Sequence, residues 1–198
     1  MEIRMTKTGK AEQKRQRRDA RENRTALLEA AAEMFRERGF EVPIDAVAAR
    51  AGVGVGTLYR HFGSKEELLL SVLTAKLDDF ENFVETHPGG ETLIIDFLRF
   101  IEGEMLLYTR AARFVLGGPA PASGGREILD RFDGIAGTVL DNARGTGSVP
   151  DWMEVEDLLT AGRMVMGIHL SGDLSDLGPE IDRALRLLAK GLEPRATD

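Results

Sequence analysis

The sequence predicts an all-α protein of about nine helices, with a small N-terminal part and a larger C-terminal part. Apolar residues recur at helical spacing through most of the 198 residues, and segments rich in proline and glycine separate the helix-length pieces. We find no strand-like alternation and no internal repeat. Residues 1–65 hold 14 Lys and Arg against 9 Asp and Glu, a net charge of +5; with −7 overall, the remainder carries −12. The first part can bind phosphate, and the acidic remainder discourages non-specific wrapping of nucleic acid.

Residues 1–20 are expected to form a polar, basic arm, with four cations between Lys14 and Arg18. A segment of this composition is either a solvated, disordered tail or an arm that follows DNA phosphates or enters a minor groove. Both interpretations stay open.

The first predicted helix spans about residues 21–38. Its inward face consists of Leu27, Leu28, Ala31, Met34 and Phe35. Gly39 fits the position just after the helix, where a left-handed backbone is common, and Phe40 can then pack on Phe35.

Residues 44–62 predict a helix-turn-helix, in which two short helices meet at a glycine turn. The apolar positions of the first helix follow helical spacing: Ile44, Val47, Ala48 and Ala51. Gly52 comes next, where glycine adopts a left-handed backbone without a Cβ penalty. Gly54 suits the N-cap of a second helix over about residues 55–62.

The second helix of such a motif can lie in the DNA major groove. On a helical wheel, Leu58 and Phe62 face inward. The candidate DNA-contacting residues are Val55, Gly56, Thr57, Tyr59, Arg60 and His61. A guanidinium can read guanine with two hydrogen bonds, whereas Tyr and Thr suit phosphate oxygens. Val55 is either buried or in contact with a thymine methyl group.

Another helix follows the helix-turn-helix directly. Ser64 and Glu67 have the spacing of a capping box, with Ser64 as N-cap and Glu67 at the third helical position. Lys65 lies in the first turn, beside free backbone N–H groups, so we expect it to contact a DNA phosphate.

The glycine-rich segment 52–56 has two other interpretations, a nucleotide-binding loop or a simple turn between core helices. A phosphate loop follows a strand and carries a lysine at a fixed position. Here the segment follows a predicted helix and lacks that lysine. The helix-turn-helix is therefore the favoured interpretation.

A set of residues within positions 24–73 has the order and spacing of a known DNA-binding region. It includes Leu27-Leu28, Ala31, Phe35, Gly39-Phe40, Val47-Ala48, Ala51-Gly52-Val53, Gly56-Thr57-Leu58-Tyr59, His61-Phe62, Ser64-Lys65-Glu66 and Leu68-Leu69. These residues resemble the tetracycline-repressor (TetR) family of bacterial regulators. Two positions depart from the family pattern, because Gly54 replaces the usual Ser and Val42-Pro43 replaces a Ser or Thr cap. The resemblance implies a dimeric DNA-binding regulator with a small-molecule site in its C-terminal domain.

The helix capped by Ser64 is expected over residues 65–85, and four further helices are expected over residues 91–116, 126–144, 152–171 and 179–192. The last two are apolar on more than one face, which suggests a four-helix bundle across a two-fold axis. The resemblance implies the same homodimer. We therefore divide the chain into an arm (1–20), a DNA-binding domain (21–73) and an effector-binding and dimerisation domain (74–198).

Candidate effector contacts, implied by the resemblance, come from the middle helices. They are Phe97, Phe100, Ile101, Tyr108, Phe132, Trp152, Met166 and His169. The plain interpretation of each is a core residue. The three histidines share no metal-ligand spacing, so we expect no metal site.

Other classes find no support in the sequence. There is no cysteine, no run of 18 apolar residues and no secretory signal, which suggests a cytoplasmic protein located at the nucleoid. We find no candidate catalytic residues and expect no cofactor. The function expected is a ligand-responsive repressor that binds a palindromic operator as a homodimer through its last two helices. The alternative is an activator, or a ligand-independent regulator, of the same fold.

Overall fold

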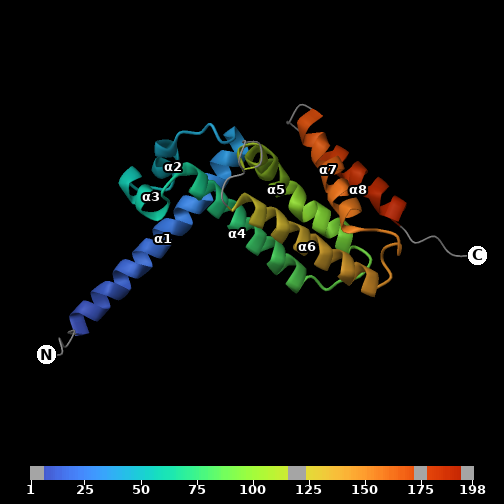
Figure 1. The fold of residues 1–198 in the computed structure, drawn as a ribbon, viewed down its shortest axis with the longest axis horizontal. Helices are drawn as coiled ribbons and strands as arrows, with labels where there is room; N and C mark the ends of the chain where they lie inside the picture. Colours follow the sequence, from blue (N-terminus) through green and yellow to red (C-terminus); the bar gives the residue numbers. More distant parts are fainter. Residues whose placement is uncertain (1–6, 116–123, 172–177, 193–198) are drawn as a thin grey trace, which may run out of the picture. The chain divides into compact units, whose positions relative to one another are not determined.

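The computed structural model describes the backbone of residues 7–115, 124–171 and 178–192. Within these ranges, the side chains that it does not describe are those of residues 7–11, 105, 106, 108–115, 166, 169–171 and 192. The described residues form eight α-helices (Figure 1). The all-α prediction is confirmed, and the described part of the chain has eight helices rather than about nine. Among the described residues, no helix is long and apolar enough to cross a membrane.

The chain separates into two compact units, residues 1–72 and 73–198. The first unit contains α1 (Lys7–Arg38), α2 (Ile44–Arg50) and α3 (Val55–His61), together with the beginning of α4 (Lys65–Thr86). The second unit contains the remainder of α4 and the four later helices.

The first unit is built around the apolar faces predicted from helical spacing. Its fully buried side chains include Leu27, Ala31, Val47, Ala48, Leu58, Phe62 and Leu68. Gly39 ends α1 with a φ of 74°, and its N–H donates to the Phe35 carbonyl at 2.9 Å. Phe40 then packs on Phe35, with 5.8 Å between ring centroids. This is the helix ending that the sequence predicted.

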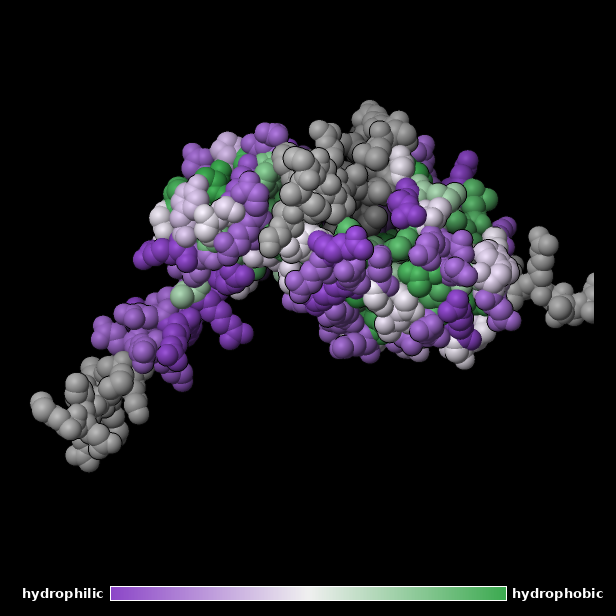
Figure 2. Space-filling model, viewed as in Figure 1, coloured by the Kyte–Doolittle hydropathy of each residue, from purple (hydrophilic) through white to green (hydrophobic). Residues whose placement is uncertain are grey.

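Helix α1 begins at Lys7, well before the predicted start near Arg21, so residues 7–20 continue the helix. The composition explains the difference, because Lys, Arg, Gln, Glu and Ala have high helix propensity. Two ion pairs at i,i+4 spacing also stabilise the helical conformation, Arg15–Asp19 and Arg18–Glu22. This segment is hydrophilic, as the purple surface of the lower part of α1 in Figure 2 shows.

The second unit packs α5 (Leu93–Val115) against α6 (Gly125–Gly145), α7 (Val155–Ser171) and α8 (Gly178–Leu192). Helix α7 also contacts α6 and α8. The central side chains of α5, Phe97, Leu98 and Ile101, are buried. At Gly162, α7 comes close to α5: a Cβ there would lie 3.6 Å from Cδ1 of Ile101. The small residue allows this approach.

Candidate DNA-binding site

The turn between α2 and α3 depends on Gly52, which has a φ of 70°. A Cβ at this position would meet no described atom within 4 Å, so the backbone conformation and not the space requires glycine. The Val53 N–H donates to the Ala48 carbonyl at 3.0 Å. This hydrogen bond brings the chain back across the end of α2 and fixes the direction in which α3 begins.

Helix α3 begins after Gly54, which has an extended backbone and no side chain to cap the helix. Its carbonyl accepts hydrogen bonds from the N–H groups of Thr57 (2.8 Å) and Leu58 (3.2 Å). Leu58 and Phe62 are 0% exposed. Burial of these two side chains fixes the rotation of the helix about its axis, as the wheel predicted, and so determines which residues face outward.

The outward face of α3 carries most of the predicted DNA-contacting residues. The exposed residues are Gly56, Tyr59 and Arg60. Val55, which the sequence analysis placed either in the core or at the DNA, is exposed too. Thr57 and His61 are half-buried at the edges of this face.

One hydrogen bond lies within the outward face of α3. Nη2 of Arg60 donates to Oγ1 of Thr57 at 2.9 Å. The guanidinium therefore lies along the helix surface.

The beginning of α4 differs in one detail from the predicted capping box. Oγ of Ser64 accepts a hydrogen bond from the Glu67 N–H at 3.1 Å, as expected. The Glu67 carboxylate, however, accepts from the N–H of Gly63 (2.8 Å) and not from that of Ser64. Lys65 is half-buried, and its Nζ lies 4.5 Å from the ring centroid of Phe40. The Phe40 ring thus positions the cation that we expect to contact phosphate.

Two arginines that the sequence analysis missed lie beside these helices. Cζ of Arg24 is 4.5 Å from the ring centroid of Phe62, so α1 covers the end of α3. Arg50 on α2 forms an ion pair of 2.7 Å with Glu33 on α1. Arg24 was detectable in principle, because it lies three residues before the buried Leu27 and so on nearly the same face of the helix.

The candidate effector residues fall into three groups. Phe97 and Ile101 are buried, and Phe132 is half-buried. Phe100 is 38% exposed, and Trp152 is 65% exposed in the segment that precedes α7. Tyr108, Met166 and His169 lie in helices, but their side chains are outside the described part of the structure.

The candidate phenylalanines belong to an aromatic cluster that also includes Phe80 and Phe83 of α4. Phe83 stacks on Phe100 at a centroid distance of 4.6 Å. Phe80 contacts Phe100 at 5.6 Å and Phe132 at 5.9 Å. The sequence analysis missed both α4 residues. Their i,i+3 spacing was visible, but their partners lie on other helices and are distant in the sequence.

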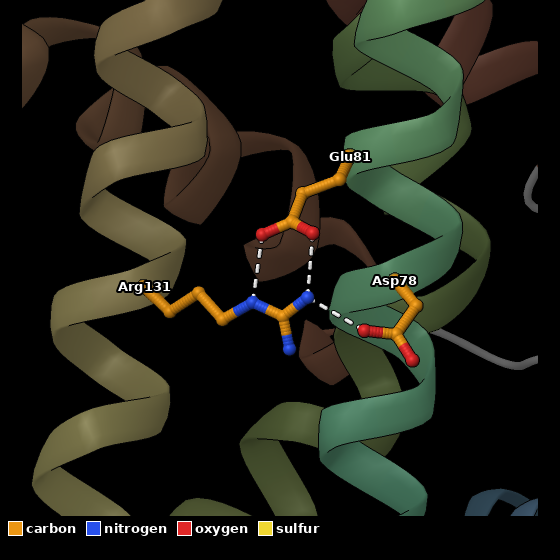
Figure 3. Close-up of polar contacts among 3 residues, drawn as sticks. All are labelled: Asp78, Glu81 and Arg131. Atoms are coloured by element: carbon orange, nitrogen blue, oxygen red, sulfur yellow. Dashed lines mark hydrogen bonds and ion pairs between the residues drawn. The ribbon is translucent and has the colours of Figure 1, made fainter.

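Arg131 connects α6 with α4 (Figure 3). Its guanidinium donates to both carboxylate oxygens of Glu81, at 2.7 and 2.5 Å, and to Asp78 at 2.6 Å. These hydrogen bonds lower the pKa of Glu81 below its ordinary value and raise that of Arg131. The aromatic cluster and this ion-pair network both join α4 to later helices of the second unit.

Among the described residues, no group of His, Asp and Glu has an arrangement that could hold a metal ion. His87, one of the three histidines, has a different role. Its Nδ1 accepts a hydrogen bond from the Gly89 N–H (3.1 Å), while its Nε2 lies 3.2 Å from a carboxylate oxygen of Asp96. The side chain therefore connects the end of α4 to α5.

Comparison with known proteins assigns this geometry to a family. The family model described as "Bacterial regulatory proteins, tetR family" matches residues 27–72, which extend from the core of α1 through α3 into α4. An HTH-type transcriptional regulator of Staphylococcus aureus strain USA300 is 43% identical over 65 residues. That match covers 32% of this chain and 35% of the relative. The chain thus matches about a third of the length of this curated relative.

Solved structures match over nearly the whole chain. A TetR transcription regulatory protein from Mycobacterium vanbaalenii is 25% identical, with a TM-score of 0.69, and the match covers 90% of this chain and 99% of that one. A transcriptional regulator from Saccharomonospora viridis, solved in complex with choline, is 17% identical with a TM-score of 0.66 over 87% and 98% of the two chains. The latter likeness concerns the fold alone. Residues 27–72 thus match the DNA-binding region of the TetR family of bacterial regulatory proteins, and the fold of the chain is like that of solved TetR regulators.

Proposed function

We propose that this protein is a ligand-responsive transcriptional repressor that binds a palindromic operator as a homodimer. The observation that carries the proposal is the orientation of α3. Leu58 and Phe62 are completely buried, so Tyr59 and Arg60 project away from the first unit beside the exposed Gly56.

The dimensions of α3 suit the major groove of DNA. A helix is about 10–12 Å across with its side chains, and the major groove is about 12 Å wide. In this docking, Arg60 reads a guanine, Val55 contacts a thymine methyl group, and Gly56 allows the backbone to approach the bases. Thr57, Tyr59 and His61 at the edges contact phosphates, as does Lys65 at the beginning of α4.

Exposed apolar residues of the last two helices support the homodimer. Met164 on α7 is 61% exposed, and Leu187 on α8 is 67% exposed. A Cβ at Gly167 would meet no described atom within 4 Å. An isologous contact of α7 and α8 with a second copy would cover these positions. It would also present two recognition helices to successive major grooves of one DNA face.

The aromatic cluster of the second unit supports a small-molecule effector. It joins α4 to α5 and α6, so a ligand that changes its packing also acts on the helix that begins in the first unit. A fold neighbour was solved in complex with choline, an example of a small molecule bound by this fold. We expect effector and DNA to oppose one another by about 1–3 kcal/mol.

The alternative function is an activator, or a regulator without a ligand, acting on the same DNA in the cytoplasm. The sign of regulation depends on where the operator lies relative to a promoter. Reporter expression in cells with and without this protein distinguishes a repressor from an activator.

The experiment that tests DNA recognition is a binding selection. Purified full-length protein is mixed with sheared genomic DNA from its source, eluted with rising salt, and the bound fragments are sequenced. Enrichment of one palindrome is the expected result, and a mobility shift on that fragment should then decrease when the effector is added. Recovery of random fragments alone would contradict a sequence-reading function for α3.

A further inference from the structure

The N-terminal half of α1 carries four cations on one face. Lys14, Arg17, Arg21 and Arg24 are exposed, and they recur at intervals of three, four and three residues. At about 100° per residue, this spacing places all four within a narrow arc of the helix surface. They form a straight line of about 15 Å along the helix, given a rise of 1.5 Å per residue. We call these four residues the basic stripe.

The acidic residues and their partners lie outside the stripe, Arg15 on the opposite side of the helix and Arg18 next to the stripe. Asp19 pairs with Arg15, at 4.0 Å, and Glu22 pairs with Arg18, at 2.8 Å. The structure describes no ion pair for Lys14, Arg17 or Arg21. The acidic residues therefore compensate Arg15 and Arg18 and leave the charge of the stripe open to a partner.

The stripe begins beside the end of α3. Arg24, its inner end, stacks over Phe62, the residue that follows α3. From there the stripe follows α1 outward, and Figure 1 shows this half of α1 extending beyond α2 and α3. The four cations are thus arranged along one helix, α1, from the end of α3 outward.

We propose that the basic stripe binds the phosphate backbone of duplex DNA beyond the base pairs that α3 reads. This inference rests on the DNA-binding function proposed above. DNA carries one negative charge per about 1.7 Å of its axis, so a line of four cations has phosphates within reach along its length. Each phosphate neutralised releases counterions and adds affinity that depends on salt and not on sequence.

The helical form of the segment determines the kind of contact. An extended arm can enter a minor groove, but that groove is about 6 Å wide and a helix is about 10 Å across. A helical stripe therefore contacts phosphates from outside. It extends the site in length and adds no base preference.

An anionic membrane surface is a less suitable partner for this segment. Helices that lie on membranes combine a basic face with an apolar face that enters the acyl region. Within residues 12–24, Ala20 is the single apolar residue, and it is exposed. The segment thus has the positive charge that would attract anionic lipids, but it lacks an apolar face that could enter the membrane.

The test compares two double variants of the full-length protein that remove equal charge from the same segment. R17Q/R21Q neutralises the centre of the stripe, and R15Q/R18Q neutralises the two arginines that are ion-paired with Asp19 and Glu22. Glutamine keeps a helix propensity close to that of arginine, and circular dichroism verifies that helix content is unchanged. Binding to random-sequence duplex DNA is measured by fluorescence anisotropy from low to moderate salt, together with the number of base pairs that each protein covers at saturation.

For R17Q/R21Q, we expect the slope of log affinity against log salt to fall by about two units per protomer, since each phosphate contact contributes about 0.9. The covered length should shorten as well. R15Q/R18Q should retain nearly the wild-type slope and length.

Equal changes in slope and length for the two variants would overturn the inference and leave DNA binding by α3 intact. Loss of binding to phosphatidylserine vesicles by R17Q/R21Q, with unchanged DNA binding, would assign the stripe to a membrane and overturn it too. Failure of the wild-type protein to bind any duplex would overturn the proposed function itself.

Discussion

At the scale of single residues, the proposed DNA contacts are exposed side chains that should contribute little to the stability of the first unit. Arg60 is exposed, and its one side-chain hydrogen bond goes to Thr57 on the same helix. Leu58, two residues away, is completely buried. Changes on the two sides of α3 should therefore have different consequences, one for binding and the other for folding.

Arg60→Ala should weaken binding to the operator by about 1–3 kcal/mol and relax the preference at one base pair, because a bidentate contact to guanine is lost. The midpoint of thermal unfolding should hardly change. The measurement is a competition assay with the selected operator, its single-base variants and random DNA. An equal loss on all these duplexes would indicate a phosphate contact instead of base reading.

Gly56→Ala should affect the stability of the free protein and its affinity for the operator in opposite directions. A Cβ at Gly56 would meet no described atom within 4 Å, so the free protein should gain up to about 1 kcal/mol of stability from helix propensity. If the bases approach α3 closely at Gly56, affinity for the operator should fall all the same.

Gly134→Ala on α6 is the matched control for Gly56→Ala. Gly134 is also helical and exposed, and a Cβ there meets no described atom within 4 Å. This variant should gain similar stability in urea unfolding and keep full affinity in the mobility shift. Unchanged operator affinity in Gly56→Ala would mean that DNA does not approach this part of α3 closely.

At the scale of elements, Arg131 and its two carboxylate partners join α4 to α6, beside the contact of Phe80 with Phe132. The pKa of Glu81 is lowered mainly by its hydrogen bonds with Arg131, so folding favours the charged carboxylate. This stabilisation is complete above the pKa of an unfolded glutamate, about 4.3. It is lost as the pH falls through the lower pKa of the folded state.

Arg131→Met should therefore reduce the free energy of unfolding at pH 7 by about 1 kcal/mol or less, because these side chains are partly exposed and screened. The difference from wild type should shrink as the pH is lowered from 5 to 2. Urea unfolding at several pH values measures it. Arg126→Met is the control, since the Arg126–Asp130 pair lies within α6 and is strongly exposed. A constant deficit across this pH range would assign the effect to packing.

The elements also show what the sequence could and could not predict. The α2–α3 turn was predictable because Gly52 and the apolar spacing around it are local signals. The extension of α1 was missed because a polar segment without apolar periodicity resembles a tail, although propensity and two ion pairs make it helical. The contacts of Phe80 and Phe83 depend on which helices become neighbours, and local spacing does not contain that information.

At the scale of the whole molecule, the proposed dimer and effector response require surfaces that one chain leaves uncovered. Leu187→Glu should shift the protein toward monomer, because it places a charge on an apolar position 67% exposed in the single chain. Sedimentation equilibrium measures the shift. Leu129→Glu on α6, where the side chain is 37% exposed, should leave the dimer intact. Equal behaviour of both variants would place the dimer interface elsewhere.

The hydrogen bond between Arg60 and Thr57 has a thermodynamic consequence. If this hydrogen bond restricts the guanidinium before DNA binds, Arg60 loses less conformational entropy on binding, and we expect Thr57 to contribute to affinity through Arg60 even without touching DNA. The two residues should then be coupled in a double-mutant cycle. Thr57→Val should weaken operator binding in the wild-type background and have a smaller effect once Arg60 is alanine. Such coupling would mean that part of what α3 contributes to recognition is the order of its surface before any DNA is present.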